Sequence, residues 1–560
     1  MGLSTAHSRL LTVIAQDPGV RQRGEIVTAR LEVPAENLGA GPVGHRIHVI
    51  DYDATRDQFV RPAPVCDEDP FENASSDELV QNPHFHAQNA YAITSATLAR
   101  FEAALGRRVR WGFGRGHQLK VAPHAFADAN AYYSREDECL AFGYFSGKQG
   151  QPVYTCLSHD IIAHETTHAL LDGVRTHFLL PSSPQQAGFH EGFADIVALL
   201  SVFRLPEAVR AALRGKNGSE SRVMKKEDLT VAKLRESSLL RLAEQMGDQM
   251  AGVRGTALRD SAQLTKNPRP PDSDEPHELG EVLVAAMLLS FLEVWVRRLF
   301  PHGPEGVQSL DRTHVIEEGA RAAGHLLTMA IRALDYTPPV DLQFDDFLSA
   351  LLTADSVLNP NDSKYRYREA LRESFAAFGI RPATRGEGLW DAPLKPANYN
   401  HCRHEAMQSD PEEMWRFVWQ NRDTLGLETD VYTYIESVRP TKRVNADGFV
   451  VHETVAEYVQ VLDVRADELG AYGLTPPVGM RPYARVVLYG GASLIFDDFG
   501  RLKFQIGSRL RSNEQQRRLQ YLYEAGRFSP GYDVRSVASM HRARVGGPGP
   551  VDPYAQRGHS

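Results

Sequence analysis

Residues 158–172 read SHDIIAHETTHALLD and contain the pattern HExxH between His164 and His168. On an α-helix, side chains four residues apart lie one turn above each other, with about 5–6 Å between their β-carbons. Two imidazoles at that spacing can bind one zinc ion at about 2.0–2.1 Å each. Glu165 projects about 100° around the helix from His164, which places its carboxylate beside the metal as a general base. The segment therefore predicts a helix that carries two ligands and the base of a catalytic zinc site.

A candidate third ligand follows in residues 188–200, which read GFHEGFADIVALL. A catalytic zinc needs three protein ligands and an open fourth position. Glu191 and Asp195 stand one turn apart on a predicted helix. Glu191 can therefore bind zinc while Asp195 accepts a ring N–H from a ligand histidine and sets its tautomer. His190 is the alternative ligand, although its side chain points about 100° away from that of Glu191.

The order HExxH and then Glu-x-x-x-Asp resembles the thermolysin and fungalysin superfamily of zinc endopeptidases, the gluzincins. This resemblance implies one catalytic Zn²⁺ held by His164, His168 and Glu191. It also implies that Asp195 and Asp172 stand behind the ligands as supporting residues. Asp172 follows the second histidine by four residues, where the family carries an aspartate.

Further segments resemble the same family in the expected order, over about residues 84–380. Asn130-Ala-Tyr-Tyr133 resembles the edge strand that binds the substrate backbone, which assigns Asn130 and Ala131 to substrate binding. Residues 277–286 resemble the helix start with the transition-state histidine, which makes His277 catalytic. Residues 255–260 resemble the segment with a substrate-binding arginine, which would be Arg259.

The fold that this resemblance implies is α+β and two-lobed, with a β-rich N-terminal lobe, a helical C-terminal lobe and zinc in the cleft. An additional small α+β domain is expected after a break rich in proline and glycine. The predicted units are a β-rich segment at 1–80, the thermolysin-like domain at 81–380, a linker at 381–400, the C-terminal domain at 401–545 and a disordered tail at 546–560.

Helical periodicity dominates from Leu157 to Phe378. The most apolar run, Val282 to Val296, carries Glu293 and falls short of the roughly 18 uninterrupted apolar residues of a membrane span, so a buried helix is expected. The predicted helices are 157–173, 189–204, 228–247, 277–299, 313–333, 344–354 and 365–378.

The sequence also departs from the family pattern. No tyrosine lies between Val174 and His190, where the family often has one, so oxyanion stabilisation is expected from His277, the zinc and a further donor that the sequence does not identify. His177 in this interval is interpreted as a surface residue. Asp160 matches a calcium ligand of the family, but the later acidic positions are replaced by residues such as Val202. Calcium is possible, but a double calcium site of the thermolysin type is not expected.

Composition limits the other classes. The 560 residues are 42% apolar and 24% charged with a formal charge of −9, and no basic run indicates nucleic-acid binding. No secretory signal is recognisable, which predicts a cytoplasmic protein, with secretion by a leaderless route as the alternative. The four cysteines form no CxxC pair and are interpreted as reduced, mostly buried thiols, Cys156 among them.

The sequence thus predicts a zinc-dependent endopeptidase that acts on a peptide or protein by means of a metal-activated water and the Glu165 base. One alternative is a zinc aminopeptidase, which shares HExxH and a later glutamate but normally carries a Gly-x-Met-Glu-Asn motif that this sequence lacks. The other is a latent or non-catalytic zinc-bound scaffold, whose function would lie in the N- and C-terminal segments.

Overall fold

The structure is a computed structural model, and it describes residues 8–528. Six single residues and five longer stretches inside this range are not described: residues 20, 23, 67, 115, 180 and 394, and residues 148–149, 214–220, 237–256, 272–273 and 446–447. The side chains of residues 236, 257–260 and 277 are also outside the description. The predicted disordered tail at 546–560 lies outside the described residues.

The N-terminal part is rich in strands. β1 (Ser8–Ile14) pairs antiparallel with β4 (Thr28–Pro34), and burial alternates along β4 because one face of the strand meets the core. A five-stranded sheet follows in the order β11-β10-β8-β5, with β9 paired to β10. Its strands are β5 (Ile47–Val49), β8 (Leu119–Phe126), β9 (Ala131–Ser134), β10 (Cys139–Ser146) and β11 (Pro152–Tyr154).

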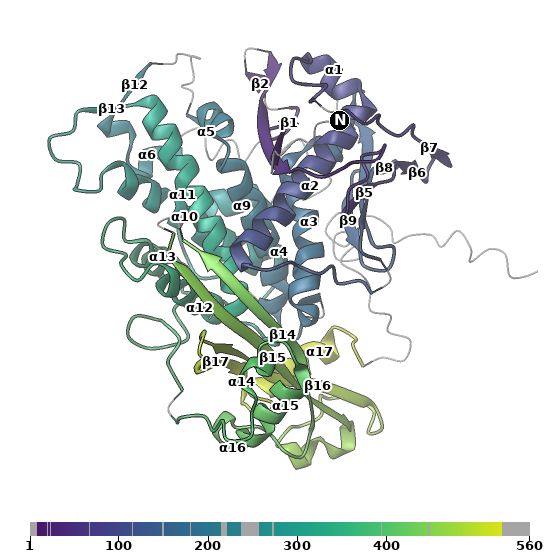
Figure 1. Cartoon of the computed structure of the whole chain (residues 1–560), viewed down its shortest axis with the longest axis vertical. Helices are drawn as coiled ribbons and strands as arrows, with labels where there is room; N and C mark the ends of the chain where they lie inside the picture. The colour runs from purple at the N-terminus through teal and green to yellow at the C-terminus, as the bar shows by residue number, and fades with distance from the viewer. Residues whose placement is uncertain are drawn as a thin grey trace, which may run out of the picture.

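Helices fill the centre of the molecule (Figure 1). α3 (His159–Val174) contacts both α2 (Pro83–Leu105) and α4 (Pro184–Phe203), and α4 packs along α10 (Pro276–Leu299). Glycines permit that close packing, because a Cβ on Gly192 of α4 would lie 2.9 Å from the carbonyl oxygen of Gly280 in α10. α3, which carries HExxH, and α4, which carries Glu-x-x-x-Asp, lie side by side in the core.

The predicted helices of this region are confirmed, with shifts of a few residues at their ends. The predicted helix at 228–247 is described only as far as α6 (Val231–Glu236). The remaining long helices are α11 (Arg312–Ala333), α12 (Phe344–Leu358) and α13 (Tyr367–Ala377). Glu278–Leu299 of α10 is apolar and long enough to cross a membrane, but 83% of its most apolar window is buried inside the fold, as in the core helix of a globular protein.

A four-stranded antiparallel sheet in the order β14-β15-β16-β17 forms the C-terminal part, at the bottom of Figure 1. Its strands are β14 (Tyr432–Val444), β15 (Val450–Arg465), β16 (Arg485–Phe496) and β17 (Leu502–Ser508). β16 and β17 form an antiparallel hairpin across residues 497–500. Gly491, at φ +148°, allows β16 to pass close to β15, where a Cβ would clash with the Tyr458 carbonyl.

Buried charges join this sheet to the helical part. Asp335, which follows α11, pairs with Arg107 at the end of α2 and with Arg443 of β14. Arg443 also pairs with Glu453 of β15. Residues 381–400, predicted to be a linker, contain no helix or strand where they are described. The C-terminal sheet is therefore held against the helical part by ion pairs as well as by apolar contacts.

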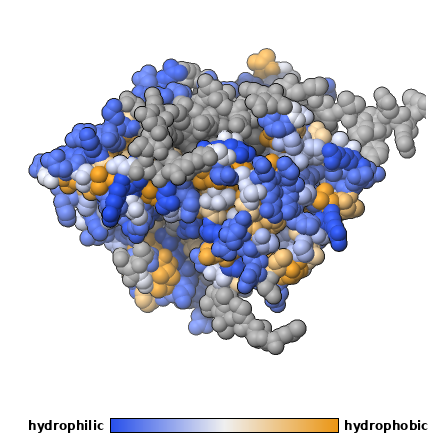
Figure 2. Space-filling view, turned by 90° about the horizontal axis from the view of Figure 1, so that it is seen from above, coloured by the Kyte–Doolittle hydropathy of each residue, from blue (hydrophilic) through white to orange (hydrophobic). Residues whose placement is uncertain are grey.

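The remaining elements are short. Seen from above, the surface is mostly hydrophilic, with small separated apolar patches (Figure 2). The short elements are β2 (Arg21–Gln22), β3 (Glu25–Ile26), β6 (Tyr52–Asp53), β7 (Gln58–Phe59), α1 (Ser76–Gln81), α5 (Pro206–Ala212), β12 (Val223–Lys225), α9 (Ala257–Leu264), β13 (Ser309–Asp311), α14 (His404–Met407), α15 (Pro411–Gln420), α16 (Arg422–Leu425) and α17 (Glu514–Glu524), with 3-10 turns at Thr155–Leu157, Thr176–Leu179, Lys226–Asp228, Leu334–Tyr336 and Ala466–Tyr472.

Candidate metal centre

The two histidines of HExxH face each other on α3. Both side chains are fully buried, and the Nε2 atoms of His164 and His168 are 2.9 Å apart. Glu191 reaches them from α4, with carboxylate oxygens 3.7 Å from His164 Nε2 and 3.8 Å from His168 Nε2. Ligand atoms of all three residues lie within 4.8 Å of one another. The structure thus brings together the three residues that the sequence nominated as zinc ligands.

The donor set of these three residues fits a zinc ion. The Nδ1–H of His164 donates to Asp195 at 2.8 Å, since a carboxylate can only accept, and this leaves the Nε2 lone pair directed at His168. Tetrahedral zinc with bonds of about 2.0–2.1 Å sets its ligand nitrogens about 3.3 Å apart, so the two rings would move apart by roughly 0.4 Å on binding. Two imidazoles and one carboxylate are a common ligand set for catalytic zinc.

His190, the alternative ligand, is placed differently. Its ring stacks on that of His168 with centroids 4.6 Å apart and an angle of 4° between the planes. The side chain is buried, and its Nδ1 lies 3.9 Å from a carboxylate oxygen of Glu191. His190 therefore packs against one of the candidate ligands and is not part of the group of three.

Glu165 is held by the strand that precedes the helix. Its Oε2 accepts the backbone N–H of Tyr133 in β9 at 3.0 Å, and its side chain is buried. The same strand carries Ala131, which pairs with Phe142 of β10, and it follows the buried Asn130. Asn130 caps its own strand, because its Oδ1 accepts the N–H of Ala131 at 2.9 Å. The candidate base and the candidate substrate-binding strand are therefore in direct contact.

Asp172 contacts the end of this strand. It accepts a hydrogen bond from the Tyr133 hydroxyl at 2.7 Å and pairs with Arg135 at 2.8 Å. Burial raises the pKa of Asp172 to about 6, although Arg135 and the Tyr133 hydroxyl oppose the shift. The resemblance placed Asp172 behind the ligands, whereas its hydrogen bond and ion pair tie α3 to the end of β9.

The remaining predicted residues are only partly described. His277 lies at the start of α10 and Arg259 in α9, but both side chains fall outside the described part of the structure. The interpretation of His177 as a surface residue is wrong. Its side chain is only 17% exposed and its ring lies against Tyr489, with Nε2 3.3 Å from the Tyr434 hydroxyl. The C-terminal sheet covers His177, and no local sequence pattern indicates that contact.

Asp160, which matches a family calcium ligand, faces Asp17 near the start of α3. The Ser158 hydroxyl lies 2.7 Å from Asp160 and 3.1 Å from Asp17. Both carboxyl groups are buried. Burial raises the pKa of Asp17 to about 6, and the neighbouring Asp160 adds to this shift. Asp17 therefore keeps a proton to a higher pH than an exposed aspartate does.

A second group of side chains of metal-ligand type lies in the N-terminal part, and the sequence did not point to it. His86, His124 and Cys156 place their ligand atoms within 4.8 Å of one another. They are 38 and 32 residues apart and belong to no spacing pattern, so no sequence signal joins them. The four cysteines are unpaired as expected, but only Cys156 is fully buried and the other three are partly exposed.

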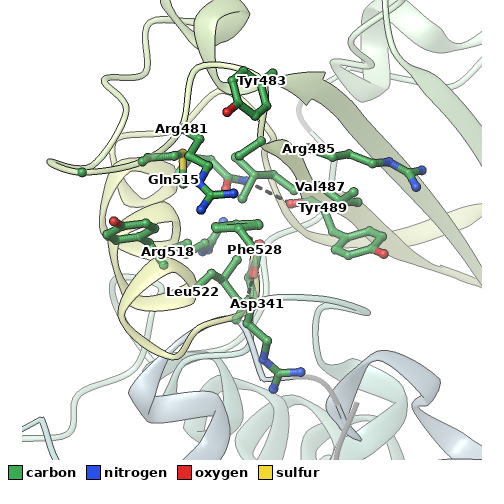
Figure 3. A pocket seen from close by; sticks show the side chains of 17 residues that line it. Asp341, Arg481, Tyr483, Arg485, Val487, Tyr489, Gln515, Arg518, Leu522 and Phe528 are labelled. Atoms are coloured by element: carbon green, nitrogen blue, oxygen red, sulfur yellow. Dashed lines mark hydrogen bonds and ion pairs between the residues drawn. The ribbon is translucent and has the colours of Figure 1, made fainter. Parts of the chain in front are cut away.

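A large cavity lies elsewhere, beside the C-terminal sheet. Its volume is about 740 Å³, and it is lined by residues 479–489 and 515–528 together with Ser182 and Asp341 (Figure 3). Arg518 in this cavity is paired with Asp341, while the guanidinium of Arg485 points away from the cavity and pairs with Asp463. The cavity contains none of the candidate metal ligands.

Comparison with known proteins adds no family. No protein-family model matches this chain. A search of curated proteins also found no similar sequence.

Proposed function

We propose that this protein is a zinc-dependent endopeptidase whose metal is held by His164, His168 and Glu191. The observation that carries the proposal is the convergence of two imidazole nitrogens and a carboxylate within 4.8 Å, beside a glutamate bound to a β-strand edge. The proposed architecture is the two-lobed thermolysin-like α+β fold, with the site between the β-rich part and the helices.

Zinc, when bound, supplies a Lewis acid that polarises the scissile carbonyl and makes water more acidic. Glu165 accepts the proton of the attacking water and delivers it to the amide nitrogen that leaves. The N–H of Tyr133 fixes the orientation of this carboxylate, which reduces the reorganisation needed during the proton transfer. Asp195 holds the ring of His164 so that its Nε2 stays available.

The substrate would lie along β9. An extended peptide that adds to a strand edge is aligned by its main-chain hydrogen bonds, which suits cleavage within a chain. In this proposal Asn130 and Ala131 align the peptide, Arg259 binds a substrate carbonyl, and His277 donates to the oxyanion. The last two roles rest on the family resemblance.

The test is cleavage of a library of peptides with blocked termini by the wild-type protein and by Glu165→Gln, with zinc measured in both. Loss of the base is expected to lower kcat/KM by about 10²–10⁴-fold while zinc is retained. Glu317→Gln is the matched control, because Glu317 is an exposed residue of α11 that pairs with the exposed Arg321. Its kcat/KM should equal that of the wild type.

Other outcomes assign the alternatives. Cleavage restricted to peptides with a free N-terminus would overturn the endopeptidase and favour the aminopeptidase. A wild-type protein that binds zinc at this site and cleaves no peptide would overturn enzymatic activity in favour of the scaffold. Equal activity of Glu165→Gln and the wild type would remove Glu165 from the mechanism.

A further inference from the structure

A second cluster of ligand-type side chains lies in the N-terminal part, separate from HExxH. It consists of His86 of α2, His124 of β8 and Cys156 of the 3-10 turn before α3. The exposed fractions of these residues are 1%, 7% and 0%. We refer to these three residues as the thiol cluster. It shares no residue with the proposed catalytic site, so the inference below does not depend on the proposed function.

Hydrogen bonds set which nitrogen of each ring is available. His86 Nε2 is 2.9 Å from the carbonyl oxygen of Val80. His124 Nδ1 is 2.7 Å from Asp51 Oδ2, and Asp51 also accepts the backbone N–H of His124 at 3.0 Å. A carbonyl and a carboxylate only accept, so both of these nitrogens carry hydrogen. The lone pairs of His86 Nδ1 and His124 Nε2 are thus left for another partner.

The two remaining nitrogens point at each other across 2.8 Å. Two lone pairs at that distance repel unless a positive charge lies between them, which is either a proton or a metal ion. His164 and His168 show nearly the same separation, 2.9 Å, in the candidate zinc site. A ring nitrogen whose opposite N–H is held by a carboxylate or carbonyl is the usual arrangement of a metal-bound histidine.

Cys156 distinguishes between the two occupants. A proton shared by two imidazoles requires no third donor, whereas a metal ion does, and the sulfur lies within 4.8 Å of both ring nitrogens. Asn89 positions this residue, since its Nδ2 donates to the Cys156 carbonyl at 2.9 Å while its Oδ1 accepts the Ile14 N–H at 2.9 Å. Complete burial excludes Cys156 from attack on a substrate, so a ligand role suits the thiol better than a nucleophilic one.

We propose that His86 Nδ1, His124 Nε2 and the Cys156 thiolate bind a second transition-metal ion, and that this ion is Zn²⁺. Two imidazoles and a thiolate are borderline-to-soft ligands that select zinc over magnesium or calcium, which prefer oxygen. The metal forms bonds to two nitrogens and one sulfur, and the thiol proton of Cys156 is released to solvent. The ion would cross-link elements that are distant in sequence, because its ligands come from α2, from β8 and from the 3-10 turn before α3.

A cavity provides the entry path and the fourth position. Its volume is about 510 Å³, and its lining includes His86 and His124 together with Asp53, Arg56 and Tyr154. The Tyr154 ring lies 4.6 Å from the ring of His86, between centroids, and 5.3 Å from that of His124. Water from this cavity can complete a tetrahedral site, while Cys156 closes its buried side.

The experiment counts metal and identifies sulfur ligation in the full-length protein. Zinc is measured by mass spectrometry after purification in zinc, and the protein is then reconstituted with Co²⁺ for absorption spectroscopy. A cobalt–thiolate bond produces a charge-transfer absorption that nitrogen and oxygen ligands do not. Because the HExxH site has no sulfur ligand, this absorption reports only the thiol cluster.

The expected results are two zinc ions in the wild type, one in Cys156→Ser and one in His168→Ala. The charge-transfer absorption is expected in the wild type and in His168→Ala, and it should be absent in Cys156→Ser. Cys402→Ser is the matched control, because Cys402 is partly exposed and lies near Gln420 in the C-terminal part; it should keep two zinc ions and the absorption.

Each other outcome has one meaning. The proposal is overturned if the wild type binds a single zinc ion, loses it in His168→Ala and shows no thiolate absorption. The thiol cluster would then hold a proton between its two rings. One metal ion with thiolate absorption supports the thiol cluster and contradicts the zinc of the proposed function. If a variant fails to fold, X-ray absorption at the zinc edge of the wild type tests the same point. A spectrum that requires one sulfur ligand per two zinc ions supports the thiol cluster, and a spectrum fitted without sulfur contradicts it.

Discussion

The two histidine clusters of this molecule share their ring geometry and differ in the third donor. In both, two imidazoles approach to 2.8–2.9 Å, and a carboxylate holds the outer nitrogen of one ring. Glu191 of α4 is the third donor beside His164 and His168, whereas Cys156 is the third donor beside His86 and His124. A carboxylate ligand beside Glu165 suits hydrolysis, while a thiolate that joins elements distant in sequence suits a cross-linking ion. The neighbours of an imidazole pair therefore decide what a metal bound there can do.

The clusters also differ in what they connect. His164, His168 and Glu191 join two adjacent helices that already pack along each other in the core. The thiol cluster joins α2, β8 and the 3-10 turn Thr155–Leu157 that precedes α3, so a metal there would link the sheet to the helical core. We therefore expect the first cluster to affect activity and the second to affect stability.

The largest expected effect is on activity, from His168→Ala. Loss of a zinc ligand should lower kcat/KM for a blocked peptide by at least about 10³-fold, equivalent to about 4 kcal/mol of transition-state stabilisation. His452→Ala, at an exposed position of β15, is the control and should retain wild-type kinetics. Substantial activity in His168→Ala would remove the functional distinction between the clusters.

The next largest effect is expected on stability. It is measured in the His168→Ala protein, so that only the thiol cluster can bind zinc. Zinc at about 100- to 1,000-fold excess over its Kd should raise the free energy of unfolding by about 3–4 kcal/mol. The same addition should have no effect on the double variant His168→Ala/Cys156→Ser. Urea unfolding with zinc or with chelator measures both values, and an equal response of the two proteins would contradict a stabilising ion at Cys156.

A smaller effect, on metal affinity, is expected from substituting the carboxylates that accept a hydrogen bond from the ligand histidines. Asp195→Ala should weaken zinc binding at the first cluster, and Asp51→Ala should weaken it at the thiol cluster, each by about 10–100-fold. Competition with a chelator of known affinity measures the two constants separately. Asp77→Ala, at an exposed position of α1, serves as the control. An effect of Asp51→Ala on the HExxH metal alone would contradict the assignment of ligands.

The smallest effect is expected at Asp17, whose buried carboxyl group lies near Asp160 and Ser158. The pKa of Asp17 is raised to about 6 by burial, so its stabilising contribution is complete below the unfolded pKa of about 3.9 and is lost as the pH rises through 6. Asp17→Asn carries no such dependence. Relative to the wild type it should therefore gain about 1–3 kcal/mol between pH 4 and pH 8.

Urea unfolding at both pH values, in the presence of a chelator, measures this difference. A gap between the two proteins that does not change with pH would show that Asp17 keeps its ordinary ionisation in the folded state. A rise in wild-type stability with calcium at pH 8, absent in Asp17→Asn, would instead indicate a cation between the two carboxylates.

Local spacing made the first cluster predictable. His164 and His168 share a helix face because of the 3.6-residue repeat, and Glu191 and Asp195 repeat the same rule on α4. The helix was predicted at 157–173 and is observed at His159–Val174. What the spacing could not supply is the packing of α3 against α4, which brings Glu191 to the two histidines.

The second cluster could not be predicted in this way. Cys156 was interpreted as a buried thiol, and burial is what the structure has, but its histidine neighbours come from α2 and β8. His177 was misplaced for a similar reason, because the tyrosines that cover it are more than 250 residues away in the chain. Long-range contacts of this kind leave no periodic pattern in a single sequence.

The sequence by itself determined the helices of the core and the residue types on their faces, because hydrogen bonding and side-chain period act over a few residues. Only the tertiary structure decided which faces meet. It brought Glu191 to the histidines, bound Glu165 to the N–H of Tyr133, and gathered His86, His124 and Cys156 around one point. Such meetings depend on the packing of whole elements, which is a property of the complete fold and not of any local segment.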